Sequence, residues 1–314
     1  MNIKHAFIAL LAATGCAWAV PHYENLDKAL AQAPAENRSI LLDFTGTDWC
    51  PACIHLSNKI LNSPEFDAAV GSRYGIVTLD FPRTKKLLDA IPPQEMKARE
   101  RLLNEYRVQG LPTVVLLDSA GLPYAVLVGS AENTEQYLAR LKEAEAARTA
   151  RDAAFAEAAT LSGEAKARAL HKGLQALPEV CRPKYTSVIE EICKSDTQDA
   201  LGYIKSARMA KLYVEQFEAF QQLTATFVGK FDAPELKDSI AKCEEFLKTP
   251  ELHPEVAQMC LGCMADAYAL LHDLPNSIKY SRRAYEAAPN SRAAHRLRTN
   301  AEFQEKILKE QSGK

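Results

Sequence analysis

The sequence predicts an α/β domain followed by an all-α helical-repeat domain. In the first part of the chain, short apolar runs alternate with helix-period segments, and we expect strands at residues 40–44, 75–81, 113–118 and 124–128. From residue 134 onward the composition favours helix and no strand signal remains. The length of 314 residues also allows about two domains.

The first residues have the features of a secretory signal rather than of a folded element. Lys4 precedes an apolar run, and residues 17–19 form a small-x-small cleavage site. We therefore expect residues 1–19 to be a signal peptide and the protein to be exported. Residues 13–16 loosely resemble a lipobox, so a lipoprotein anchored through Cys16 is the alternative. Both interpretations place the protein where disulfides persist.

Composition and charge exclude two classes of partner. The chain is 47% apolar and 25% charged, which is typical of a soluble globular protein. Its formal net charge of −2 provides no bulk attraction to nucleic acid. We therefore expect no nucleic-acid partner. The leading apolar run is too short to span a bilayer, so we also expect no membrane span.

The first strand leads into a pair of cysteines at the start of a helix. A helical segment at residues 25–33 precedes the strand, and a short turn follows it. Cys50 and Cys53 come next, before a helix-period segment that runs to Leu61. A Cys-x-x-Cys at such a junction is a redox site. The helix N-terminus favours a thiolate on the first sulfur, and the second sulfur lies one turn deeper.

The remaining elements of the α/β domain alternate in the same way. Ser63 is a typical N-cap residue and Pro64 a typical first residue of a helix, so we expect a short helix to start there. A charged helix with a narrow apolar side begins at Pro93; we interpret it as a solvated helix, with a rim element that shapes substrate access as the alternative. The helix from Thr134 runs to about Leu161, so no flexible linker is expected between the domains.

Together these residues resemble the thioredoxin superfamily. Asp43 stands where thioredoxins carry a buried acid, and residues 110–113, Gly-Leu-Pro-Thr, match the loop that carries their cis-proline. Residues 43–50 look more narrowly like exported bacterial proteins with a DFTGxDWCxxC signature. The resemblance extends over residues 22–148. It implies a thioredoxin-like fold with a central mixed sheet flanked by helices, in an exported, periplasmic protein.

The resemblance also implies a protein thiol-disulfide oxidoreductase. Cys50 exchanges with a substrate disulfide and Cys53 resolves the mixed disulfide. Trp49 shields the sulfurs and, with Leu111 and a cis Pro112, contributes to substrate binding. No cofactor and no metal are required. The expected partners are protein dithiol or disulfide substrates and a redox partner; the direction of electron transfer stays open.

Asp43 is the third catalytic residue that the resemblance implies, as the carboxylate that takes the proton of Cys53; a plain buried carboxylate is the alternative. This sequence departs from ordinary thioredoxin in two ways nearby. One additional residue separates Asp43 from Cys50, and Thr78 stands where thioredoxins carry a lysine.

The region 149–314 is predicted to be an α-helical domain. Residues 258–291 fit a tetratricopeptide repeat without a gap, residues 234–247 resemble half of a diverged neighbour, and residues 292–308 form a capping helix. Such hairpin arrays usually bind a partner or pack on their own chain, and they rarely carry chemistry. The alternative function is therefore a non-catalytic adaptor that binds a protein partner through the helical domain and uses the thioredoxin-like part as a scaffold.

The other cysteines favour structural roles. Cys260 and Cys263 form a second Cys-x-x-Cys, but inside a helix, where we expect them to fill the core. Cys243 is placed to face Cys260 across a helical hairpin, so a disulfide between them is a hypothesis. Cys181 and Cys193 are expected on one helix, and His55 is expected to face solvent. No metal site is predicted.

Overall fold

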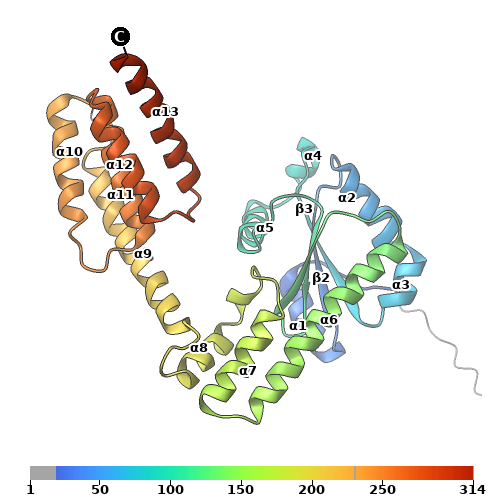
Figure 1. Ribbon diagram of the computed structural model, residues 1–314. Coiled ribbons are helices and arrows are strands. Elements are labelled where there is room, and N and C mark those ends of the chain that lie inside the picture. Colours follow the sequence, from blue (N-terminus) through green and yellow to red (C-terminus); the bar gives the residue numbers. More distant parts are fainter. Residues whose placement is uncertain (1–18, 230, 314) are drawn as a thin grey trace, which may run out of the picture. The chain divides into compact units, whose positions relative to one another are not determined.

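The computed structural model describes residues 19–229 and 231–313, so the predicted signal peptide and Cys16 lie outside the described residues. The chain divides into two compact units, one ending at Leu201 and the other beginning at Gly202. Figure 1 shows the sheet and its helices in the first unit and a group of helices in the second. The predicted fold class, an α/β thioredoxin-like fold followed by an all-α region, is confirmed.

The first unit is built on a five-stranded mixed sheet. Its strands, in spatial order, are β1 (His22–Tyr23), β3 (Tyr74–Asp80), β2 (Ser39–Thr45), β4 (Thr113–Leu117) and β5 (Pro123–Val128). β2 is parallel to β3, which is parallel to β1, while β4 runs antiparallel to both β2 and β5. The strand β2, which leads to the cysteines, therefore lies at the centre of the sheet and is buried along its length.

Alternation along β2 separates an apolar face from the face that carries the buried acid. Ile40, Leu42 and Phe44 pack with the helix α1 (Leu26–Glu36) in one core cluster. Because successive side chains of a strand point to opposite faces, Asp43 lies on the other face. The register places Asp43 beside Thr78 of β3, the residue that the resemblance placed near it.

The helix starts follow local capping signals, and the start predicted at Ser63 and Pro64 is confirmed. The side chain of Asn25 accepts a hydrogen bond from Lys28 N at the start of α1. Ser63 Oγ accepts from the backbone at the start of α3 (Pro64–Val70), and Asn133 does so at the start of α6 (Thr134–Ala159). Such caps satisfy backbone donors that have no partner within the helix.

The connection after β3 forms two helices, α4 (Lys85–Leu88) and α5 (Pro93–Glu105). The predicted helix start at Pro93 is confirmed. Tyr106 follows α5 and is buried against Phe44 of β2 in an edge-to-face contact. The helix α5 is thus fixed to the core at its C-terminal end.

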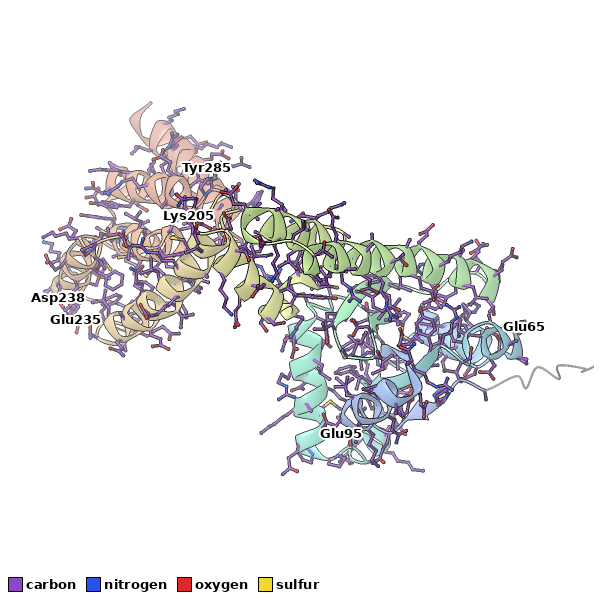
Figure 2. All side chains as sticks on the ribbon, turned by 90° about the horizontal axis from the view of Figure 1, so that it is seen from below. Glu65, Glu95, Lys205, Glu235, Asp238 and Tyr285 are labelled. Atoms are coloured by element: carbon purple, nitrogen blue, oxygen red, sulfur yellow. A yellow bond between two sulfur atoms is a disulfide. The ribbon has the colours of Figure 1, made fainter. Side chains whose placement is uncertain are left out.

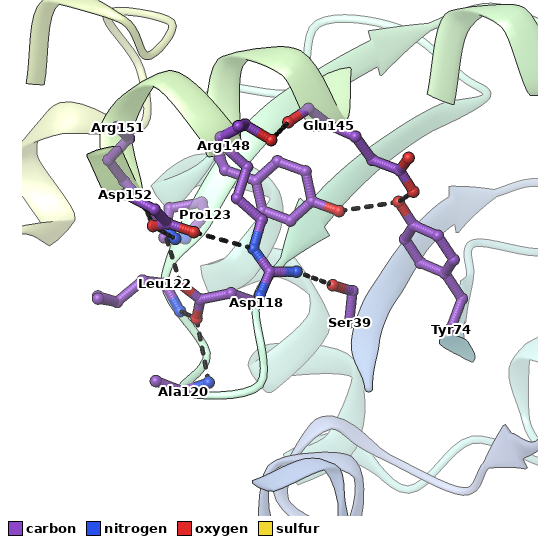
Figure 3. Close-up of polar contacts among 12 residues, drawn as sticks. Ser39, Tyr74, Asp118, Ala120, Leu122, Pro123, Glu145, Arg148, Arg151 and Asp152 are labelled. Atoms are coloured by element: carbon purple, nitrogen blue, oxygen red, sulfur yellow. Dashed lines mark hydrogen bonds and ion pairs between the residues drawn. The ribbon is translucent and has the colours of Figure 1, made fainter. Parts of the chain in front are cut away.

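The first unit continues past the predicted domain boundary. Residue 148 falls inside α6, and the helices α7 (Gly163–Gln175) and α8 (Thr186–Ser195) belong to the same compact unit. Arg151 of α6 donates to the carboxylate of Asp118 at 2.8 Å and to Tyr185 Oη at 2.5 Å. Figure 3 shows this polar cluster between α6 and the β4–β5 turn. Contacts of this kind hold the additional helices to the sheet.

The second unit contains five helices among the described residues: α9 (Tyr203–Ala225), α10 (Ala233–Phe246), α11 (Pro254–Leu270), α12 (Leu274–Ala287) and α13 (Ala294–Ser312). The predicted hairpin at residues 258–291 is observed as α11 and α12. Asp273 accepts from Asn276 N at the turn between them. Whether this hairpin is of tetratricopeptide type stays a prediction.

The cysteines outside the active site differ in part from expectation. Cys243 and Cys260 are free thiols; Cys260 Sγ donates to the backbone oxygen of Cys243 at 3.4 Å, so the two are neighbours without a disulfide. Cys260 is fully buried in the helical core, as a filler residue should be. The prediction that Cys181 and Cys193 share a helix is wrong, because Cys181 lies in the turn before a short 3₁₀ helix, Arg182–Lys184.

Across the described part of the chain, no helix combines the length and apolar character needed to cross a membrane.

Candidate active site

Cys50 and Cys53 lie where the sequence predicted them, at the start of the helix α2 (Pro51–His55). Cys50 is the N-cap residue, and its Sγ accepts a hydrogen bond from Cys53 N at 3.3 Å. The two residues form a disulfide with their Cα atoms 5.2 Å apart. Cys50 is 6% exposed and Cys53 is 0% exposed. The first sulfur is therefore the one that a partner can reach, because the second is covered by protein.

The helix that begins at Pro51 changes geometry after one turn. It continues as a π-helix, Leu56–Leu61, where the sequence predicted one regular helix. Asn62 N donates to Ser57 O, the five-residue spacing of a π-turn. π-turns are frequent at functional sites. The expectation that His55 faces solvent is wrong: it is half-buried, and its Nε2 lies 3.1 Å from Ala131 O, within hydrogen-bond distance.

The loop before β4 lies beside the first sulfur. The Leu111–Pro112 peptide bond is cis, as the resemblance predicted. Leu111 O lies 3.7 Å from Cys50 Sγ, and Pro112 O accepts a hydrogen bond from Gly129 N at 2.8 Å. The backbone of this loop is thus fixed to β5 on one side and contacts the site on the other.

Trp49 is held in one orientation by three contacts. Its Nε1 donates to Phe81 O at 2.8 Å. The guanidinium carbon of Arg83 lies 3.7 Å from the centre of the indole ring. On Gly46, a Cβ atom would approach Trp49 Nε1 to 2.6 Å, so only glycine leaves room for the indole there. The tryptophan is packed between Gly46 and the segment that follows β3.

Asp48 and Asp80 fix the loop before the cysteines, and the sequence analysis assigned neither a role. Asp48 accepts hydrogen bonds from the backbone of Arg83 and of Thr84, the latter at 2.6 Å. The pKa of Asp48 lies below its usual range, first because of a hydrogen bond with the Thr84 side chain and then because of these backbone donors. Asp80 accepts from Thr47 N at 2.8 Å and from Thr47 Oγ1 at 2.7 Å. The only sequence signal was an acid directly before Trp49 and another at the end of a strand.

Asp43 is a buried carboxyl group with a raised pKa. It is 3% exposed, and burial, followed by the charge of Asp80, raises its pKa to about 7. Its Oδ1 has no hydrogen-bond partner among the described residues. The same is true of Tyr137 Oη on α6, whose pKa is raised by burial and by the charge of Asp43. A carboxyl group with this pKa can accept or release a proton near neutral pH.

Metal ligands do not gather around the cysteines. Within residues 19–229 and 231–313, no group of three or more His, Cys, Asp or Glu side chains is arranged to hold a metal ion. The cysteine pair can carry out thiol-disulfide exchange with its own two sulfurs as the reacting atoms.

Comparisons with known proteins relate the first part of the chain to thioredoxin-like proteins. A family model described as a thioredoxin-like domain matches residues 26–145. The chain is 30% identical over 122 residues to the disulfide bond reductase DsbH of Chlamydia pneumoniae, with 39% of this chain and 71% of the relative aligned. It is also 30% identical over 104 residues to the thiol:disulfide interchange protein DsbD of Vibrio cholerae serotype O1, which covers 33% of this chain and 15% of that protein. A solved structure of a DsbH oxidoreductase is 28% identical in sequence and matches with a TM-score of 0.37. The match covers 44% of this chain and 94% of that chain.

Proposed function

Because this chain belongs to the thioredoxin-like family and is a thiol-disulfide oxidoreductase, we propose that it exchanges disulfides with exported protein substrates through Cys50 and Cys53. The observation that carries the proposal is the position of Cys50: a slightly exposed sulfur at a helix N-terminus, disulfide-bonded to a fully buried Cys53. An adjacent loop offers its backbone beside that sulfur.

The reaction needs the two sulfurs of the protein and the two of the substrate. In the reduced protein, the Cys50 thiolate attacks one sulfur of a substrate disulfide, forms a mixed disulfide and releases the other sulfur as a thiolate. Cys53 loses its proton and attacks Cys50 Sγ. This step forms the Cys50–Cys53 disulfide and releases the second substrate sulfur as a thiol after protonation. Two electrons pass from the protein to the substrate, and the reverse sequence oxidises a dithiol.

The helix start stabilises the charged form of Cys50. Cys53 N points at Cys50 Sγ, and the first backbone N–H groups of a helix have no partner within the helix. A hydrogen bond to an ionised sulfur favours the thiolate, and the helix dipole adds to this effect. Both contributions favour the thiolate of a reduced cysteine at this position, and the thiolate is the nucleophilic form.

We assign Asp43 the role of accepting the proton that Cys53 must lose. Its pKa of about 7, its burial and its unpartnered Oδ1 support this role. Trp49, Leu111 and Pro112 are assigned to substrate binding. The position of Leu111 O beside Cys50 supports pairing with the backbone of a substrate chain.

Reduction of substrate disulfides is the direction we favour, since the relative aligned over 71% of its length is named a disulfide bond reductase. Export to the periplasm rests on the signal-like residues 1–19. Anchoring through a lipid on Cys16 is the alternative.

The helical unit supports a second function, the binding of a protein partner. An open groove of about 860 Å³ lies between α9, α11 and α13, with an apolar lining that includes Phe220, Met259, Leu297 and Phe303. The hairpin of α11 and α12 agrees in length with the tetratricopeptide-like pattern of residues 258–291. In the adaptor alternative, this unit recruits a partner and the cysteine pair is not used.

Two variants test the proposal. Cys50→Ser is expected to abolish insulin reduction, and Cys53→Ser is expected to accumulate mixed disulfides with substrate proteins because the resolving sulfur is missing. Cys193→Ser is the matched control, because Cys193 is a half-exposed free thiol of the same unit and should leave both assays unchanged. No trapped substrate, together with normal partner pull-down by the helical unit, would favour the adaptor.

A further inference from the structure

Three basic side chains lie beside the active site. Arg83, Lys85 and Lys86 are exposed and follow β3 directly. Across the residues that the structure describes, no ion pair is recorded for any of the three. The segment 83–91 contains these three basic residues and one acid, Asp89, so its formal charge is +2. We call residues 83–88 the basic rim.

The basic rim is fixed to the catalytic loop rather than free to move away from it. Asp48, two residues before Cys50, accepts hydrogen bonds from the backbone of Arg83 and Thr84. The guanidinium of Arg83 lies on the ring of Trp49, the residue next to Cys50. Thr84 is the N-cap residue of α4, so these contacts place the start of α4 beside the start of α2 (Figure 1).

Three acids near the basic rim, Asp48, Asp80 and Glu95, have partners outside it or in its backbone. Asp48 accepts from backbone N–H groups, and Asp80 accepts from Thr47. Glu95, labelled on α5 in Figure 2, pairs with Arg99, whose guanidinium also donates to Asp80 O. Neither these acids nor Asp89 at the end of α4 forms an ion pair with Arg83, Lys85 or Lys86 in the described part of the chain.

The basic rim also exposes apolar surface. Leu87 is 41% exposed and Leu88 is 44% exposed, and both belong to α4. Ile54 of the active-site helix is 38% exposed. A surface that combines apolar side chains with unpaired positive charge fits a peptide segment with apolar and acidic residues, because guanidinium binds carboxylate with two parallel hydrogen bonds.

We propose that the basic rim selects substrates: it binds acidic residues that flank the reacting disulfide of a protein substrate. The inference rests on the proposed function and adds the substrate class. Arg83 is the central residue, because stacking on Trp49 holds its planar group in one orientation near Cys50, and a pre-oriented group loses less entropy on binding. Lys85 and Lys86 add attraction at longer range, which increases the rate of productive encounters.

The test compares three disulfide-bonded peptides of equal length whose cysteines are flanked by Glu, Gln or Lys. The reduced full-length protein is mixed with each peptide at low ionic strength, and the second-order rate of peptide reduction is measured. Each rate is divided by the rate with dithiothreitol, which corrects for the effect of the flanking charges on the disulfide itself. We expect the Glu peptide to react about tenfold faster than the Lys peptide, with a smaller ratio at high salt.

The double variant Lys85→Glu/Lys86→Glu is expected to lower the ratio of the Glu-peptide rate to the Lys-peptide rate to about one or below. The single variant Arg83→Gln is also expected to lower this ratio. Lys142→Glu is the matched control, an exposed lysine of α6 without a recorded ion pair, and should keep the wild-type ratio. Equal corrected rates for the wild-type protein, or a wild-type ratio in both rim variants, would overturn the inference. Failure of the wild-type protein to reduce any of the three peptides would instead refute the proposed function.

Discussion

Arg151 and Asp118 form a buried ion pair, with 2.8 Å between Arg151 Nη1 and Asp118 Oδ2. The other oxygen of Asp118 accepts from the backbone of Ala120 and Leu122, so one carboxylate shapes the β4–β5 turn and holds α6 against it (Figure 3). Tyr185, beyond α7, completes the group by donating to Pro123 O at 3.0 Å. The helices that extend the thioredoxin-like part are therefore attached through a polar cluster that is almost fully satisfied.

Breaking this pair should destabilise the first unit strongly. Arg151→Met leaves the buried Asp118 charge without its partner, and we expect a loss of roughly 3–5 kcal/mol in the free energy of unfolding. The double variant Arg151→Met/Asp118→Asn should lose clearly less than the sum of its single variants, because no unpaired charge remains. Urea denaturation followed by circular dichroism measures both. Additive losses would show that the two side chains do not interact energetically.

Asp43 should make stability depend on pH in a defined window. Its folded pKa is about 7, whereas an unfolded aspartate ionises near pH 4, so between these values the folded state binds more protons. The free energy of unfolding should therefore fall as pH rises from about 4 to about 7. In Asp43→Asn this fall is absent, and the variant should gain up to about 4 kcal/mol relative to wild type across the window. Urea midpoints at pH 4, 5.5, 7 and 8 measure the difference; parallel curves for the two proteins would contradict the prediction.

Gly46 should tolerate no side chain. A Cβ atom at this position would lie 2.6 Å from Trp49 Nε1 and 2.7 Å from Trp49 Cε2, so Gly46→Ala forces the indole away from Phe81 O and Arg83. We expect a loss of about 1–3 kcal/mol in stability and slower insulin reduction. Gly110→Ala is the control, since outside residues 109–111 no atom lies within 4 Å of the added methyl group. Equal effects of the two substitutions would argue against the packing explanation.

Asp48 should control the order of the segment that follows β3. In Asp48→Ala, the backbone N–H groups of Arg83 and Thr84 lose their acceptor, so their amide hydrogens should exchange faster with solvent. Hydrogen-exchange mass spectrometry of a peptide spanning residues 82–88 measures the change. Asp89→Ala, at the other end of α4, is the matched control. Unchanged exchange in Asp48→Ala would mean that α4 is held by other contacts.

Much of the catalytic site was predictable because its signals are local. The Cys50–Cys53 spacing, the proline after the first cysteine and the start of a helix lie within a few residues of one another. Pro112 was identified by its loop, and its cis bond followed from the resemblance. The contacts of Asp48 with Thr84, and of Trp49 with Arg83, were missed because they join residues more than 30 positions apart. An isolated acid or arginine carries no information about which distant group it will meet.

The sequence by itself determined the order of the elements, the helix starts and the chemistry of the cysteine pair. These depend on periodicity, on capping and on side-chain type, which act between near neighbours in the chain. The tertiary structure alone decided that the first unit extends to Leu201, that Asp43 titrates near neutral pH, and that Arg83 lies beside the catalytic loop. The physical reason is that burial, the local electric field and long-range hydrogen bonds depend on how distant segments pack, and packing is a property of the whole folded unit.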